Sequence, residues 1–214
     1  MMRKLLLTCF GFMLLCQSFA QSGLFITGGV NLSNSRPDSA SVNRGQLAPT
    51  ISTGFSFRIS NRIFLKPELQ YSQRGFKQVV RNVGNNINFA REVKQVIHYL
   101  ELPLTAAIAI PAGKNQLLIA GGPVLGWALG GRQTTTTVLV TNRTSTERTL
   151  EFGNDVNQIQ PLDIGGRIEL SYLLKSNLIL KADYNHGLRN LSNRAGSEFF
   201  NQSFGLGIGY LFSL

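Results

Sequence analysis

Residues 162–174 alternate between two kinds of side chain, and this alternation constrains the fold more than any other feature of the chain. The odd positions carry Asp163, Gly165, Arg167, Glu169 and Ser171. The even positions, apart from Gly166, carry Leu162, Ile164, Ile168, Leu170, Tyr172 and Leu174. Successive side chains of a β-strand point to opposite sides, so a period of two predicts a strand whose faces meet different surroundings.

The last residues of the chain repeat this pattern with one large face and one very small face. The large face carries Phe204, Leu206, Ile208, Tyr210, Phe212 and Leu214. The opposite face carries Ser203, Gly205, Gly207 and Gly209. A strand at the surface of a soluble protein would present polar side chains to water on that second face. Glycine is better suited to the crowded interior of a narrow barrel.

Six further segments follow the same pattern, so the sequence predicts eight strands. Together with the two segments already described, the eight predicted strands are residues 24–33, 50–60, 62–73, 98–110, 116–130, 162–174, 177–188 and 203–214. Their lengths match the roughly 9 to 11 residues that a tilted strand needs to cross a bilayer. The predicted fold class is therefore all-β: a transmembrane, antiparallel, up-and-down β-barrel of about eight strands.

The connections between these segments alternate between short and long. Short turns occupy residues 60–61, 111–115 and 175–176, whereas long polar connections occupy residues 34–49, 74–97, 131–160 and 189–200. All turns then lie on one side and all loops on the other, as in outer-membrane barrels with periplasmic turns and extracellular loops. Threonine and valine at 134–141 favour strand, so the third connection is expected to extend as a hairpin above the membrane.

The N-terminus is typical of a secretory signal peptide. Arg3 and Lys4 precede an apolar run at residues 5–16, and small residues at Ser18 and Ala20 predict cleavage after Ala20. The domain organisation predicted is a signal peptide at 1–20 and one barrel domain at 21–214, located in the outer membrane of a Gram-negative bacterium. Both cysteines precede the cleavage site, which excludes disulfides and thiolate metal sites from the mature chain.

The small or polar faces of the strands carry nine charged residues that we expect in the barrel lumen. They are Arg58, Lys66, Glu68, Glu101, Asp163, Arg167, Glu169, Lys181 and Asp183. Four cations against five anions predict mutual pairing, since buried charges are normally paired. An eight-stranded barrel has an interior just wide enough for its own side chains, so we expect no open channel. A gate or proton path is the alternative interpretation.

The chain is basic, with 21 lysines and arginines against 11 acidic residues, and the second long connection is its most basic part. This connection carries Arg74, Lys77, Arg81, Arg91 and Lys94. Outer-membrane lipid, and in particular the phosphates of lipopolysaccharide, is the nearest anionic partner for these residues, and a protein partner or a simply solvated loop is the alternative. Nucleic acid is not expected as a partner, because no recognition motif is present.

The sequence gives little support to catalysis. Both histidines, His98 and His186, fall on the apolar face, and Ser192 is the nearest serine to His186 beyond its own strand. Asp183 lies on the opposite face, so no triad is predicted. No metal-ligand spacing or phosphate loop is present, and we expect no cofactor and no enzyme. A lipid-modifying enzyme and a soluble periplasmic ligand-binding barrel are the alternatives.

Five short motifs occur in order along the chain: GGVNLS at 28–33, KPELQYSQRG at 66–75, YLELPL at 99–104, AGGP at 120–123 and YNHGL at 184–188. In this order and spacing they resemble the PorT-like outer-membrane β-barrel family of Bacteroidetes. The resemblance implies an eight-stranded outer-membrane barrel in a family whose members mostly lack an assigned activity. The namesake takes part in protein secretion and gliding motility. Pro67, Pro103 and Pro123 lie inside predicted strands, where we expect β-bulges.

Overall fold

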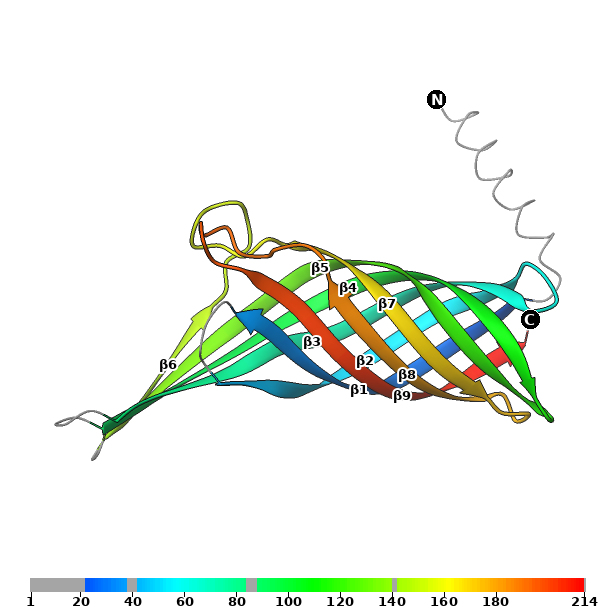
Figure 1. Cartoon of the computed structure of the whole chain (residues 1–214), viewed down its shortest axis with the longest axis horizontal. Helices are drawn as coiled ribbons and strands as arrows, with labels where there is room; N and C mark the ends of the chain where they lie inside the picture. Colours follow the sequence, from blue (N-terminus) through cyan, green and yellow to red (C-terminus); the bar gives the residue numbers. More distant parts are fainter. Residues whose placement is uncertain (1–21, 38–41, 84–87, 140–141, 214) are drawn as a thin grey trace, which may run out of the picture.

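The computed structural model describes residues 22–37, 42–83, 88–139 and 142–213, so the predicted signal peptide at 1–20 lies outside the described residues. Nine strands make up almost all of the described chain (Figure 1). Their bounds are β1 (Ser22–Pro37), β2 (Val42–Arg58), β3 (Ile63–Val83), β4 (Asn88–Ala112), β5 (Asn115–Leu139), β6 (Arg143–Thr149), β7 (Leu162–Leu173), β8 (Leu178–Gly187) and β9 (Phe199–Ser213). Within this part of the chain, no helix is long and apolar enough to cross a membrane.

Eight of the strands form one closed antiparallel barrel. The sheet order is β4-β3-β2-β1-β9-β8-β7-β5-β6, and an additional pairing of β4 with β5 completes the ring. The first and last strands pair along their whole length, from Gly23 opposite Ser213 to Pro37 opposite Phe199. β6 pairs with the outer part of β5 and lies outside the ring (Figure 1). The predicted fold class is therefore confirmed.

The two faces of the barrel wall are as the alternation predicts. Ile168 is 65% exposed on the outer face, whereas its neighbour Glu169 is 1% exposed in the interior. Outward-facing apolar residues occur on every strand of the ring, and they include Ile26, Ile51, Leu69, Leu102, Leu125, Leu180 and Leu206. Trp127, Tyr184, Tyr210 and Phe212 are exposed on the same face. A soluble barrel would bury this apolar face around its ligand, so the soluble alternative does not fit the fold.

Three strands extend far beyond the barrel ring and form a protruding sheet. β3 and β4 stay paired as far as Val83 and Asn88, and β5 continues to Leu139 with β6 beside it. Figure 1 shows this sheet as a tongue at the loop end of the barrel. The expectation of a long polar loop at 74–97 is thus wrong, because most of this segment is a strand hairpin. The hairpin expected within the third connection is confirmed.

The prolines inside strands do not form the expected bulges. The register of β3 and β4 is the same on both sides of Pro67, and the register of β4 and β5 is the same on both sides of Pro103. Next to each of these prolines the ladder omits two residue pairs without shifting, because proline has no N–H to donate. The shifts in register lie instead between Gly45 and Thr50 and between His98 and Tyr99.

The opposite facing of Ile168 and Glu169 gives a direct test of the fold. Ile168→Arg places a charge on the lipid side near the middle of β7 and should lower the free energy of unfolding by about 2 to 4 kcal/mol. Glu169→Gln should destabilise the barrel by leaving Lys66 and Lys181 short of negative charge. Adding Lys66→Gln should therefore recover part of the loss caused by Glu169→Gln, but none of the loss caused by Ile168→Arg. Denaturant titrations in lipid vesicles measure these effects.

Ile168→Leu is the matched control, since it keeps the apolar character and volume of the side chain and should cost less than about 1.5 kcal/mol. A harmless Ile168→Arg substitution, or its rescue by a second change in the lumen, would mean that the two faces of β7 are reversed.

Candidate functional site

Arg167 lies at the centre of a buried polar network that fills the middle of the barrel. Its side chain is fully buried, and its guanidinium donates hydrogen bonds to Asn185 at 2.7 Å and to Gln70 at 3.0 Å. Three carboxylates surround it, with N–O distances of 3.5 Å to Glu68, 3.6 Å to Glu101 and 3.7 Å to Asp183. One cation on β7 therefore joins acidic residues from β3, β4 and β8 across the lumen.

Two lysines continue this network toward the turn end of the barrel. Lys181 Nζ lies 2.8 Å from Glu68 and 3.3 Å from Glu169, and Lys66 pairs with the other oxygen of Glu169. The Ser171 hydroxyl donates a further hydrogen bond of 2.7 Å to Glu169. The carboxylate of Glu169 thus contacts two cations and one hydroxyl, which compensates for its removal from water.

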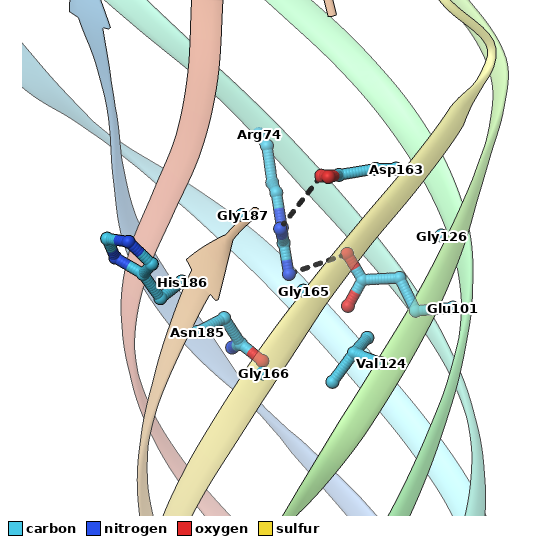
Figure 2. Close-up of a pocket in the computed structure, with 10 residues that line it drawn as sticks. All are labelled: Arg74, Glu101, Val124, Gly126, Asp163, Gly165, Gly166, Asn185, His186 and Gly187. Atoms are coloured by element: carbon cyan, nitrogen blue, oxygen red, sulfur yellow. Dashed lines mark ion pairs between the residues drawn. The ribbon is translucent and has the colours of Figure 1, made fainter. Parts of the chain in front are cut away.

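Arg74 continues the network toward the loop end. Its guanidinium lies 2.8 Å from Glu101 and 3.6 Å from Asp163, and Figure 2 shows it between these two carboxylates. Asn201 donates to Asp163 at 2.8 Å and to the Tyr99 hydroxyl at 3.1 Å. The cavity beside Arg74 measures about 10 Å³, which is near the roughly 10 to 15 Å³ that a single water requires. The lumen is therefore closed at this level.

The structure places eight of the nine charged residues predicted for the lumen in this network. We call these eight residues, Arg74 and their uncharged hydrogen-bonding partners the lumen network. The ninth, Arg58, lies at the turn end, where it donates to the Ser60 carbonyl at 3.2 Å and to Asn61 at 3.3 Å. The expectation that Arg74 lies in a loop and contacts lipid phosphate is wrong, because β3 continues past it and directs its side chain inward. The uncharged members of the lumen network, which the sequence did not single out as lumen residues, include Gln70, Ser72, Tyr99, Ser171, Asn185 and Asn201.

A cleft of about 590 Å³ opens at the loop end of the barrel. Its apolar lining includes Leu150, Ile159, Leu191 and Phe199, and Leu150 and Leu191 are themselves buried. Four charged residues also line it: Arg148, Glu151, Arg194 and Glu198. A volume within the roughly 300 to 1,000 Å³ of ligand sites, lined by both apolar and polar side chains, is suited to holding a side chain of a partner.

β6 presents an open backbone edge beside this cleft. The Leu150 N–H donates to the Gly131 carbonyl on β5. Because every second residue of an antiparallel strand bonds to the same neighbour, Arg148, Thr146 and Thr144 also direct their backbone groups toward β5. The N–H and C=O groups of Arg143, Ser145, Glu147 and Thr149 consequently point away from β5. Among the described strands, β6 pairs only with β5, and every β6 side chain is exposed.

The other basic residues predicted to contact phosphate lie on the protruding sheet. Lys77 and Lys94 are directly opposite each other in register and share the outer face, where Lys77 pairs with Glu92 at 2.7 Å. Arg91 is exposed, but its odd position on β4 directs it to the opposite face of the sheet. The side chain of Arg81 lies outside the described residues. The structure thus brings two of the five residues together on one face.

Each histidine pairs with a tyrosine on the outer face of the barrel. The Tyr71 hydroxyl lies 2.7 Å from His98 Nδ1, and the Tyr184 hydroxyl lies 3.2 Å from His186 Nδ1. Within the described chain neither histidine bonds to a serine hydroxyl or a carboxylate, and the Ser192 hydroxyl accepts instead from the Arg194 N–H. No group of three histidine, cysteine or acidic side chains there could hold a metal ion. This geometry gives no support to the hydrolase alternative.

A closed eight-stranded ring with an apolar outer face and a charged, filled interior defines a β-barrel of the outer membrane. The family model for the outer membrane protein beta-barrel domain matches residues 19–193, and the chain belongs to this family. No curated protein matches the chain. The turn end is accordingly periplasmic and the loop end extracellular.

Several solved structures are similar in fold. Ail of Yersinia pestis is 14% identical with a TM-score of 0.41, and the match covers 90% of this chain and 99% of Ail. OprG of Pseudomonas aeruginosa is 11% identical with a TM-score of 0.38 and covers 91% of this chain and 98% of its own. Neisserial surface protein A is 11% identical with a TM-score of 0.40 and covers 89% and 97%.

The central position of Arg167 gives a testable stability difference. Arg167→Met should lower the free energy of unfolding by about 3 to 5 kcal/mol, because it leaves buried carboxylates without their shared cation. Arg132→Met is the matched control, since it breaks the exposed pair of Arg132 with Glu147 at 2.9 Å, and it should cost at most about 1 kcal/mol. Urea titrations in vesicles compare the two, and similar small losses would show that the lumen is hydrated.

Proposed function

We propose that this protein is a non-conducting outer-membrane barrel that binds an extended segment of a partner polypeptide at the cell surface. The observation that carries the proposal is the continuity of the open edge of β6 with the extracellular cleft. An added strand would form main-chain hydrogen bonds to Arg143, Ser145, Glu147 and Thr149. Where β6 ends, such a strand reaches the cleft, whose mixed apolar and polar lining accepts one of its side chains.

The distribution of charge supports a surface role over transport. The lumen network closes the barrel interior, so solutes and polypeptides have no path through it. If the chain takes part in protein secretion, as the namesake of the PorT-like family does, it acts as a docking partner and not as a conduit. The cleft carries two cations and two anions, which suits a segment of mixed charge better than a strongly acidic or basic one.

We further propose that Lys77 and Lys94 contact phosphates of lipopolysaccharide. Two like charges directly opposite each other on adjacent strands repel, and a bound anion would relieve that repulsion. Both residues lie on the outer face of the sheet, on the extracellular side of the Tyr71–His98 pair. The polar part of the surrounding lipid lies at this height. Glu92 compensates for only one of the two charges.

Photocrosslinking in native outer membranes tests the β6 edge. A photoreactive residue at Thr146 should form adducts with a protein, whereas the same residue at Lys114, in an exposed turn on the periplasmic side, should form a different set or none. Ser145→Pro removes an N–H that faces away from β5, so it should reduce the Thr146 adducts while the β5–β6 pairing persists. Ser145→Ala is the control and should leave them unchanged. Equal adducts in the proline and alanine variants would contradict strand addition.

The lysine pair is tested by lipopolysaccharide binding to the purified barrel in nanodiscs. Lys77→Gln with Lys94→Gln should weaken binding several-fold at low ionic strength, and the difference should shrink as salt screens the charges. Arg91→Gln removes one charge from the opposite face of the same sheet and should have little effect. The proposal fails if the double variant binds as well as the native protein at low salt.

A further inference from the structure

A second cavity, of about 250 Å³, lies inside the barrel at its periplasmic end. Lumen-facing side chains from every strand of the ring except β4 enclose it, and six of the eleven are apolar, in contrast to the charged middle of the barrel. The apolar lining comprises Phe25, Phe64, Leu118, Leu173, Ile179 and Leu211. The surface role proposed above does not involve this cavity, and among the described residues the lumen network reaches it only through Lys66 and Ser171.

Beside the cavity, one part of the barrel wall presents very small inward side chains. β4 contributes only Ala107 and Ala109 at this level, and these pack with Leu118 against Phe64 and Leu173. Toward the middle of the barrel, the cavity ends at Lys66, which pairs with Glu169 of the lumen network. A molecule that enters from the periplasm therefore meets an apolar chamber with a closed inner end.

The charged lining of this cavity is entirely cationic in the part of the chain that the structure describes. Lys66 lines the inner end, where its Nζ lies 5.3 Å from the centre of the Phe25 ring. Arg58 lines the cavity near the periplasmic turn, as its hydrogen bonds to Ser60 and Asn61 require. Neutral donors come from Ser56, Gln116 and Ser171. An apolar chamber with a cation at its entrance is complementary to an apolar chain that ends in an anion.

The volume restricts the ligand further. The volume of about 250 Å³ lies just below the roughly 300 Å³ at which sites for drug-sized ligands begin. Phospholipids carry two long acyl chains and lipid A carries more, so neither fits inside. A single short acyl chain is small enough for such a space. The guanidinium of Arg58, which also donates to Ser60 and Asn61, places a positive charge near the entrance that attracts a carboxylate.

We propose that the periplasmic cavity binds a single-chain anionic amphiphile of the medium-chain fatty acid class. The acyl chain lies among Phe25, Phe64, Leu118 and Leu173, and the carboxylate lies at Arg58. Binding is non-covalent and fills an apolar space that would otherwise hold poorly bonded water.

Photolabelling distinguishes this site from the surrounding lipid. A decanoate analogue with a diazirine at the chain end, added to the barrel in nanodiscs and mapped by mass spectrometry, should label lumen-facing residues of β1 and β5, such as Phe25 and Leu118. Leu118→Trp fills the cavity and should abolish the lumen label. Ile119→Trp, at the adjacent outward position, should leave it unchanged. Labels confined to outward residues such as Ile26 and Ile119 would overturn the proposal.

The carboxylate assignment is tested separately, with a variant at the entrance that keeps the barrel interior intact. Arg58→Gln should weaken lumen labelling by the decanoate probe at least about tenfold, because a charge-assisted hydrogen bond is lost. Labelling by the corresponding decanol probe should be unaffected by Arg58→Gln. If both probes label the lumen equally and Arg58→Gln changes neither, the cavity does not select anions and the proposal is wrong in that respect.

Discussion

The backbone pairing between β1 and β9 is the interaction on which the rest of the structure depends. The hydrocarbon core of a bilayer offers no partner to a backbone N–H or C=O group, and each unsatisfied group costs several kcal/mol there. The pairing of the first strand with the last removes both open edges of the sheet at once. Glycine makes the close approach possible: a Cβ at Gly29 would lie 2.1 Å from the Leu206 carbonyl oxygen, and a Cβ at Gly209 would lie 2.3 Å from that of Ile26.

Closure of the ring also determines the chemistry of its interior. Eight strands enclose a space that their own side chains fill, and the inward positions of β3, β4, β7 and β8 are charged. These charges are stable there because each carboxylate of the lumen network lies within 4 Å of a cation from another strand. The network therefore braces the barrel across its diameter, whereas the backbone ladder holds it only around its circumference.

The sequence was sufficient for the barrel wall, because period-two alternation directly reports which face of a strand meets lipid. Ile168 and Glu169 could be assigned in this way. Arg74 could not, since the strand predicted at 62–73 ends one residue before it. The even-numbered face that carries Lys66, Glu68, Gln70 and Ser72 nevertheless continues to Arg74. The partners within the lumen could not be predicted either. Which carboxylates surround Arg167 depends on the stagger of strands that are distant in sequence, and alternation carries no information on stagger.

The length of β4 and β5 has a mechanical consequence. Each strand has 25 residues and runs without interruption from the periplasmic turn through the membrane into the protruding sheet. At roughly 3.3 Å per residue, each is about 80 Å long. The edge of β6 is therefore supported by strands that continue from the membrane-spanning wall, and not by a flexible loop. A partner bound at this edge, as proposed above, would be held at a set distance from the membrane, because the strands beside β6 are continuous with the barrel wall.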